Sequence, residues 1–181
     1  MNKFEKVSFE QYKKDDQFEP IDIEDTSDWD ADDWASWEEG LKDEYEEIKL
    51  PKRATTGSAG YDIFAPYPFS IPPYETRIIP TGIRVLLDDD KFLAIYPRSG
   101  LGFKCKMQLY NTVGIIDSDY CKSDNEGHIW VKFYNDSPDN KTIHIGEGEA
   151  MCQGIIQQFF KTDDDETDGI RNGGFGSTGA Q

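Results

Sequence analysis

The stretch HIWVKFYNDSPDNKTIHI, residues 128–145, decides the fold class because apolar and polar side chains alternate along it. Alternate positions face opposite sides of an extended chain. The two faces carry Ile129, Val131 and Phe133 on one side and Trp130, Lys132 and Tyr134 on the other. The Asn-Asp-Ser-Pro-Asp-Asn sequence that follows consists of residues that favour turns. The stretch therefore predicts two β-strands joined by a polar turn.

The same pattern of period two occurs before this stretch. RIIPTGIRVLL, residues 77–87, places Ile83, Val85 and Leu87 on one face, and KFLAIYP at 91–97 follows an Asp-Asp-Asp turn. Short strands of this kind, separated by Pro, Gly and Asp turns, predict an all-β domain of the jelly-roll or barrel type. We expect its core to span residues 50–160.

The first 49 residues have a different character. Residues 1–14 predict an N-terminal edge strand, from Phe4 to Tyr12. Residues 15–49 form an acidic insertion with a predicted helix, whose apolar face carries Trp34, Trp37, Leu41, Tyr45 and Ile48. The candidate N-caps of this helix are Ser27, Asp28 and Asp30. Two interpretations stay open: the helix packs its tryptophans on its own domain, or it docks on a partner protein, as a nucleic-acid mimic does.

Charge and cysteine content restrict the class of protein. The chain of 181 residues has a formal net charge of −17, which disfavours a nucleic-acid surface or an anionic membrane as partner. A phosphate ligand would need a basic pocket or a metal ion to offset this charge. The three cysteines form no C-x-x-C pair and do not combine with His128 and His144 at zinc-site spacing. The cysteines fit a reducing cytoplasm best, so we expect a cytoplasmic protein. No apolar run approaches the ~18 residues of a membrane span.

Five short stretches carry more chemistry than a β-core needs. They are AGYDIFA at 59–65, PRSGLG at 97–102, NTVGIIDSDY at 111–120, GEAMCQGII at 148–156 and RNGGFGSTG at 171–179. Taken singly, each has a structural explanation. Arg98 can form an ion pair with Asp62. The residues Asp117 and Asp119 can be ordinary turn formers, and Gln153 can face solvent from an edge strand.

Taken in order, the five stretches closely resemble the signature motifs of the trimeric deoxyuridine triphosphate nucleotidohydrolases, the dUTPases. The resemblance extends from about Leu50 to the C-terminus. It implies a distorted jelly-roll barrel, a homotrimer with active sites at subunit interfaces, and residues 161–181 as a linker and a C-terminal arm that closes over a neighbour's site. It also implies Mg²⁺-dependent hydrolysis of dUTP to dUMP and pyrophosphate, which limits uracil in DNA and supplies dUMP.

The resemblance also implies roles for individual residues. Asp117 would activate the water that attacks the α-phosphate, a task suited to an ionised carboxylate. Tyr120 would lie against the deoxyribose and exclude a 2′-hydroxyl. The uracil would be held by Asn111, Gly114, Ile116, Phe175 and the backbone of a hairpin near Ile129 and Trp130. The phosphates would be held by Arg98, Ser99, Gly100, Gln153, Arg171, Ser177 and Thr178, with Asp62 in support. Mg²⁺ would be held by phosphates and water rather than by protein side chains.

The sequence departs from the family pattern in three places. CKSDNE, residues 121–126, separates Tyr120 from Gly127 and is expected to lengthen the tip of the hairpin. Ala150 stands where the family commonly has an arginine, and the acidic insertion has no counterpart in the minimal enzyme. Two alternatives therefore stay open: a dCTP deaminase of the same superfamily, and a regulatory protein of dUTPase fold that binds a partner through its acidic insertion.

Overall fold

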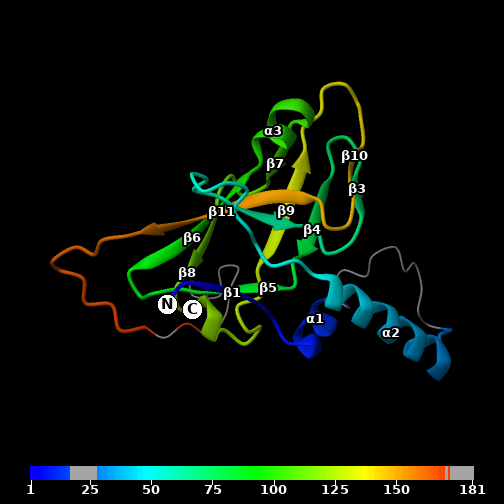
Figure 1. Ribbon diagram of the computed structural model, residues 1–181, viewed down its shortest axis with the longest axis horizontal. Helices are drawn as coiled ribbons and strands as arrows, with labels where there is room; N and C mark the ends of the chain where they lie inside the picture. Colours follow the sequence, from blue (N-terminus) through cyan, green and yellow to red (C-terminus); the bar gives the residue numbers. More distant parts are fainter. Residues whose placement is uncertain (17–27, 170, 172–181) are drawn as a thin grey trace.

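The structure is a computed structural model that describes residues 1–16, 28–169 and 171 (Figure 1). Its strands are β1 (Lys3–Lys6), β2 (Tyr61–Phe64), β3 (Phe69–Ile71), β4 (Thr76–Pro80), β5 (Ile83–Leu86), β6 (Lys91–Pro97), β7 (Met107–Leu109), β8 (Gly114–Asp117), β9 (Trp130–Asn135), β10 (Ile143–Ile145) and β11 (Ala150–Gln158). Its helices are α1 (Phe9–Asp16), α2 (Ala31–Glu47), α3 (Ser99–Cys105) and the short 3₁₀ helix η1 (Tyr120–Lys122). The all-β prediction for the core is confirmed.

The strands form small antiparallel sheets rather than one closed barrel. The largest has the order β2-β11-β6-β8, a second has the order β4-β9-β7, and the pairs β10-β3 and β1-β5 complete the set in the described residues. Strand β6 pairs with β11 along its whole length, from Lys91 to Pro97, and is an inner strand of the largest sheet. Figure 1 shows β9 and β4 crossing beside this sheet, with α3 at one end and α1 and α2 at the other.

The alternation in residues 128–145 is confirmed. Ile129 and Phe133 are fully buried and Val131 is nearly so, whereas Trp130, Lys132 and Tyr134 are partly exposed. The two predicted strands, β9 and β10, do not pair with each other, however. Strand β9 pairs with β4 and β7, and β10 pairs with β3. Alternation predicted the strands and their inner faces, but a strand's partner depends on contacts between distant segments.

The hairpin expected around Tyr120 is wrong. Strand β8 pairs with β6, from Phe92 opposite Asp117 to Ile95 opposite Gly114, and β9 belongs to a different sheet. Between them the chain forms η1 and a tight turn that ends at Gly127. A Cβ atom at Gly127 would lie 2.5 Å from the Cα atom of Cys121, so only glycine fits there. The extra residues thus form most of η1 and the turn packed against it instead of extending a hairpin tip.

The predicted edge strand from Phe4 to Tyr12 is half wrong. Strand β1 covers Lys3–Lys6 and pairs with β5, but α1 begins at Phe9. The Ser8 hydroxyl accepts a hydrogen bond of 3.1 Å from the Gln11 amide, which is the contact of a helix N-cap. Helix formation turns Tyr12 inward, where its side chain is fully buried.

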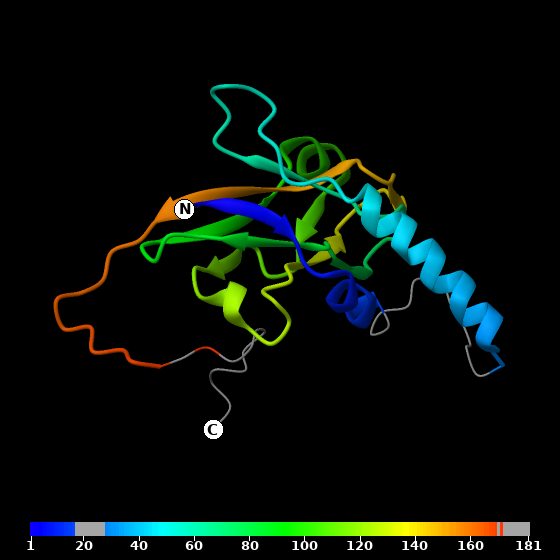
Figure 2. The same cartoon turned by 60° about the horizontal axis from the view of Figure 1, so that its bottom comes forward.

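Helix α2 begins as predicted at Asp30, which forms a reciprocal capping box with Asp33. Of the other two candidate caps, Asp28 does not cap the helix and Ser27 lies outside the described residues. The C-terminal half of α2 packs on the body: Leu41 is buried, Ile48 is buried just beyond the helix end, and the Tyr45 hydroxyl donates to the carbonyl of Val7 at 2.7 Å. The N-terminal half projects outward (Figure 2), and Trp34 is 40% exposed.

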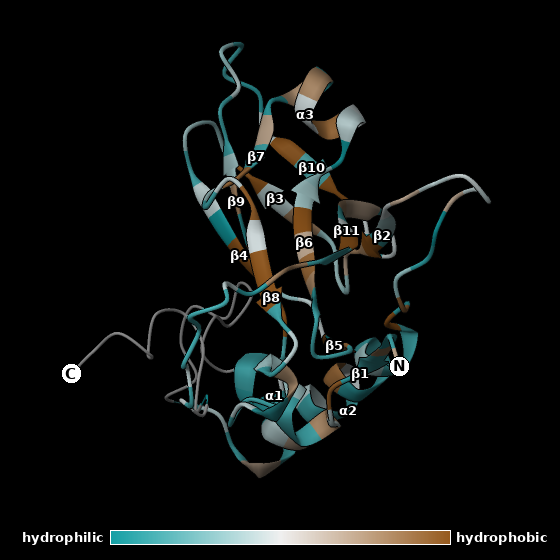
Figure 3. Ribbon diagram, turned by 90° about the vertical axis from the view of Figure 1, so that its left-hand side faces the viewer, coloured by the Kyte–Doolittle hydropathy of each residue, from teal (hydrophilic) through white to brown (hydrophobic). Residues whose placement is uncertain are grey.

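Hydropathy follows this arrangement. Figure 3 shows hydrophobic residues along β6 and β8 and hydrophilic ones over much of α1 and α2. Within the described ranges, no helix has the length and apolar character needed to cross a membrane.

Candidate active site

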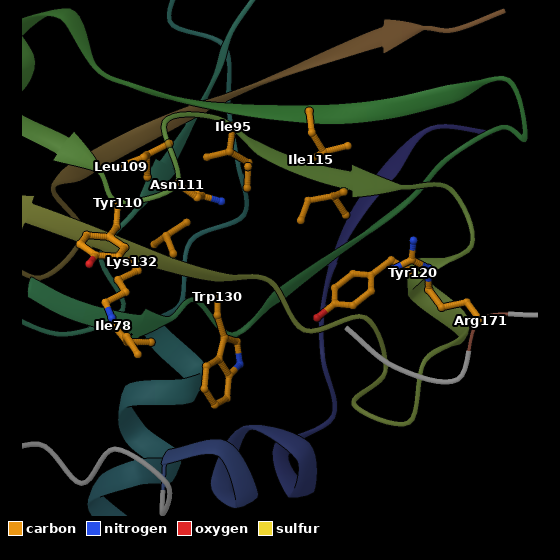
Figure 4. A pocket seen from close by; sticks show the side chains of 13 residues that line it. Ile78, Ile95, Leu109, Tyr110, Asn111, Ile115, Tyr120, Trp130, Lys132 and Arg171 are labelled. Atoms are coloured by element: carbon orange, nitrogen blue, oxygen red, sulfur yellow. The ribbon is translucent and has the colours of Figure 1, made fainter. Parts of the chain in front are cut away.

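A cavity of about 490 Å³ lies between β8 and β9 (Figure 4). It falls in the size range of small-molecule sites. Most of its lining is apolar, and its polar side chains come from a few positions. The lining residues are Ile78, Ile95, Leu109, Tyr110, Asn111, Gly114, Ile115, Ile116, Tyr120, Trp130, Val131, Lys132 and Arg171.

Two elements, the turn after β7 and strand β8, place three of the predicted site residues in this cavity. Asn111 lies in the turn after β7, where Thr112 adopts the left-handed conformation, with φ 69°. Gly114 begins β8, and a Cβ atom there would lie 3.3 Å from the Cβ of Ile95 on β6. Ile116 follows two positions later. Asn111, Gly114 and Ile116, all predicted to bind the nucleoside, therefore line one cavity.

Tyr120 is held rigidly at one end of the cavity. Its side chain is buried, and its hydroxyl donates to the carbonyl oxygen of His128 at 3.0 Å. The Asn125 amide donates to the same hydroxyl at 2.9 Å. Burial raises the pKa of the Tyr120 phenol, so the hydroxyl stays protonated. Hydrogen bonds at its tip fix the ring that faces the cavity.

The uracil-binding role predicted for the Ile129 backbone does not fit the structure. The Ile129 amide donates to the carbonyl of Ile83 at 2.9 Å. The Ile129 carbonyl accepts from the amide of Thr81 at 3.1 Å and from its hydroxyl at 2.6 Å. Both backbone groups are therefore already used to join β9 to the turn between β4 and β5. The Trp130 side chain, by contrast, lines the cavity.

Arg171 joins the C-terminal segment to the end of β8. Its guanidinium pairs with the carboxylate of Asp117, and its Nε lies 2.9 Å from Oδ1 of Asp119. The Asp117 and Asp119 side chains are 47% and 45% exposed, whereas Arg171 is 21% exposed. The sequence had assigned Arg171 to phosphates at a neighbouring subunit's site. In this single chain it contacts the chain's own carboxylates, with its guanidinium carbon 5.9 Å from the centre of the Tyr120 ring.

A second cluster of predicted residues lies outside the cavity. Arg98 forms an ion pair with Asp62 at 3.1 Å, which is the structural role that the sequence analysis offered for it. It also donates to the carbonyl of Ala150 at 3.2 Å. The Gln153 amide donates to the carbonyl of Pro97 at 3.0 Å. Strand β11 lies between β2 and β6, so Gln153 does not face solvent from an edge strand. Ser99 and Gly100 follow Arg98 directly, at the start of α3.

The structure thus groups the predicted residues into two sets. Asn111, Gly114, Ile116, Tyr120, Trp130 and Arg171 line the cavity, with Asp117 at its edge beside Arg171, and Asp62, Arg98, Ser99, Gly100 and Gln153 form the second cluster. The predicted roles of Phe175, Ser177 and Thr178 lie outside the described residues.

Sequence reasoning missed His128. Its side chain is fully buried, and its Nε2 accepts a hydrogen bond of 2.7 Å from the Gly82 amide. Because Nε2 accepts, Nδ1 carries the proton and donates to Oδ2 of Asp15 at 2.5 Å. The two partners are 113 positions apart, and no spacing pattern in the sequence indicates such a pair.

Similarity to known proteins identifies the family of this chain. The sequence model of one family, described as dUTPase, matches residues 46–179. The chain belongs to the dUTPase family. A deoxyuridine 5′-triphosphate nucleotidohydrolase of Lactococcus lactis subsp. lactis (strain IL1403) is 41% identical over 136 residues, which span 74% of this chain and 89% of that protein. Its counterpart in Hahella chejuensis (strain KCTC 2396) is 42% identical over 141 residues, spanning 75% and 90%.

Solved dUTPase structures share the fold. The crystal structure of the Streptococcus mutans dUTPase superposes with a TM-score of 0.59 at 33% identity, covering 65% of this chain and 91% of the other. The dUTPase of phage phi11 of S. aureus, described with a structural Mg(II) ion, superposes with a TM-score of 0.57 over 68% of this chain and 92% of its own. At 20% identity, the phage enzyme supports the fold alone. The dUTPase match starts at residue 46, so β1, α1 and most of α2 precede it.

Proposed function

We propose that this member of the dUTPase family hydrolyses dUTP to dUMP and pyrophosphate. The observation that carries the proposal is the continuity of β8, whose residues Gly114–Ile116 line the cavity and whose last residue is Asp117. A nucleoside in the cavity would share this strand with a half-exposed carboxylate. Relatives named deoxyuridine 5′-triphosphate nucleotidohydrolase, at 41% and 42% identity, support the same reaction.

In this mechanism Asp117 is the general base. Its carboxylate would orient a water molecule and accept its proton as the oxygen attacks the α-phosphorus, while pyrophosphate leaves. Arg171 would exchange its carboxylate partners for phosphate oxygens when the triphosphate binds, which frees Asp117 to hold water. A guanidinium suits both partners because its donors match carboxylate and phosphate oxygens in pairs.

Selectivity would come from the cavity. The Tyr120 ring, fixed by His128 and Asn125, would pack against the sugar and leave no room for a 2′-hydroxyl, so UTP is excluded. Asn111 would hydrogen-bond the uracil edge. Cytosine exchanges a donor for an acceptor there, and each buried group left unpaired costs about 1–3 kcal/mol. We assign stacking on the base to Phe175 and further phosphate contacts to Ser177 and Thr178.

The second cluster supports a homotrimer with shared sites. Arg98, Ser99, Gly100 and Gln153 suit phosphates but do not line the cavity of their own chain. Assembly would bring this cluster of one subunit to the cavity of another. Phe103, which is 92% exposed on α3 near Arg98, is the kind of side chain that a subunit interface buries.

We propose that magnesium enters with the substrate. Among the described residues, no three Asp, Glu, His or Cys side chains converge to form a cation site. Mg²⁺ characteristically keeps phosphate oxygens and water as ligands, so the triphosphate would supply them. When bound, the ion would neutralise phosphate charge, which a chain of net charge −17 needs. We also propose a cytoplasmic enzyme, because Cys105, Cys121 and Cys152 are all free thiols.

The test is pyrophosphate release from dUTP, with UTP, dCTP and dTTP as competing substrates. We expect turnover of dUTP alone. Ammonia released from dCTP would favour the deaminase alternative and contradict the proposal.

A protein partner is the second candidate function. Trp29, just before α2, and Trp34 and Trp37 on its projecting half form a chain of edge-to-face contacts, with ring centres 4.8 and 5.7 Å apart. Replacing Trp34 with Ala and measuring dUTP turnover would separate docking from catalysis, because Trp34 lines no part of the cavity.

A further inference from the structure

The N-terminal segment that precedes the family match is attached to the wall of the cavity at two points. We propose that α1 is a positioning element for this wall, and that it sets discrimination between deoxyribose and ribose by holding Tyr120 and Trp130 through two contacts, Ser8–Glu126 and Asp15–His128. The inference rests on the proposed function, since it assigns the sugar to the side of the cavity that Tyr120 forms.

The first contact joins the start of α1 to the inserted turn. The backbone amide of Ser8 donates to Oε2 of Glu126 at 2.8 Å, and its hydroxyl donates to Oε1 at 2.6 Å. Partial burial opposes ionisation of Glu126, but the two bonds from Ser8 outweigh it and hold the pKa of Glu126 below its usual value. Glu126 adopts a left-handed backbone, with φ 57°, which a non-glycine residue rarely does. Ser8 thus binds the turn at a residue with a left-handed backbone.

The second contact joins the end of α1 to the residue before Ile129. Asp15 is 5% exposed and accepts hydrogen bonds from His128 Nδ1 at 2.5 Å and from the side-chain amide of Gln11 at 2.9 Å. Its pKa is raised by burial and lowered more by these bonds, so the net shift is downward and the carboxylate stays ionised. Removing one partner of such a buried pair leaves the other without its hydrogen bond.

Both contacts end at the groups that hold Tyr120 and Trp130. The His128 carbonyl accepts the Tyr120 hydroxyl, and Asn125, next to Glu126, donates to it. Asn125 also accepts from the Gly127 amide at 3.2 Å, which closes the turn on itself. The Trp130 indole nitrogen lies 3.3 Å from Nδ1 of His128, and because that atom already carries a proton, the indole N–H donates to the Asp15 carboxylate. Figure 4 shows Trp130 directed toward α1 and Tyr120 on the same side of the cavity.

A displacement of this turn would therefore move the Tyr120 ring. Exclusion of a 2′-hydroxyl depends on placing the ring against the sugar to within about 1 Å, so a loosened ring admits UTP before it abolishes dUTP turnover. If α1 only stabilised the fold, breaking its contacts would lower the melting temperature without changing the ratio of kcat/KM for dUTP to kcat/KM for UTP.

Glu126→Asn is the sharpest variant. Asparagine tolerates the left-handed backbone but is one methylene too short to reach Ser8. Glu126→Gln keeps the length and an accepting oxygen and serves as the conservative rescue. Glu38→Gln is the matched control, because it breaks the 2.5 Å pair between Lys13 on α1 and Glu38 on α2 without touching the turn.

The measured quantity is the ratio of kcat/KM for dUTP to that for UTP, with the melting temperature of each variant. We expect Glu126→Asn to lower this ratio by about tenfold, the effect of one lost hydrogen bond to a charged group, through a lower KM for UTP and little change in kcat for dUTP. Asp15→Asn should lower it in the same direction, Glu126→Gln should recover most of it, and Glu38→Gln should leave it unchanged.

An unchanged ratio in both Glu126→Asn and Asp15→Asn, whatever their melting temperatures, would overturn the inference. If Asp15→Asn fails to fold, Glu126→Asn decides alone, since its contact lies at the surface. A wild-type protein with no dUTP turnover would instead contradict the proposed function, and that failure is seen before any variant is made.

Discussion

Arg171 pairs with Asp117 across 54 positions of the chain and so brings the C-terminal segment to the end of β8. The same guanidinium bonds to Asp119, which makes Arg171 a bridge between two carboxylates. The base proposed for catalysis is therefore paired with the cation proposed to bind the substrate phosphates. The state of this pair is the first thing to test.

Replacing Asp117 with Asn should lower kcat by about 10² to 10⁴, the usual contribution of a general base. The amide cannot accept a proton from water, but it fills the same space. Pyrophosphate release measures the loss, and calorimetric titration with dUTP should show that binding persists. A fully active Asp117→Asn enzyme would exclude this residue as the base.

Replacing Arg171 with Ala should lower kcat/KM for dUTP by on the order of 10², the effect of losing one group that stabilises developing charge. Asp119→Asn is the control, since it removes one partner of Arg171 and leaves the pair with Asp117 intact. We expect less than tenfold loss in this control, an estimate for a neutralised exposed pair. Equal losses in both variants would show that Arg171 serves to hold Asp119 rather than the phosphates.

Chelation of metal should stop turnover without unfolding the protein. No described cluster of side chains supplies a cation site, so EDTA should abolish pyrophosphate release while the far-ultraviolet circular dichroism stays unchanged. Added Mg²⁺ should restore activity. A loss of secondary structure with EDTA would reveal a structural ion and contradict the proposal that magnesium arrives with the triphosphate.

Stability should depend on pH through Glu44. Burial, with repulsion from Asp16 and Glu147, raises the pKa of Glu44 from 4.5 to about 7, although the Tyr12 hydroxyl donates to its carboxylate. Folding thus favours the protonated acid, and this stabilisation, complete below pH 4.5, is lost as the pH rises through 7. The Asp16 carboxyl behaves alike, since burial raises its pKa to about 6.

Glu44→Gln isolates this effect. The amide still accepts from Tyr12 but carries no charge, so the variant should melt about 2–4 °C above the wild type at pH 8, with the difference shrinking near pH 5. Differential scanning calorimetry at the two pH values measures it. A difference that is the same at both would mean that the Glu44 charge is not the cause.

The local elements of the core were predictable because their causes are local. Alternation in residues 128–145 gave the buried face of β9, and Asp30 followed by Asp33 gave the start of α2. The cavity residues Asn111, Gly114 and Ile116 were predictable because one motif carries all three. In each case a short stretch contains both the signal and the contacts that produce the structure.

Pairing between distant segments was not predictable in this way. Strand β8 pairs with β6 instead of forming the expected hairpin. The backbone N–H and C=O of Ile129, which had been assigned to uracil, are hydrogen-bonded to Ile83 and Thr81 instead. The apolar residues of α1 also fit a strand, but the Ser8 hydroxyl caps a helix by accepting from the backbone amide of Gln11. These outcomes depend on which partner a group finds in three dimensions, and a pattern along the chain does not contain that information.

The pairing of β1 with β5 has a practical meaning for anyone who expresses this protein. A clone that begins at residue 46, where the family match begins, would leave the edge of β5 without its partner from Lys3 to Lys6. It would also remove Tyr12, which is fully buried against the rest of the chain. An uncovered strand edge invites pairing between molecules. The shortened protein should therefore precipitate, so a fragment made for expression should include residues 1–16.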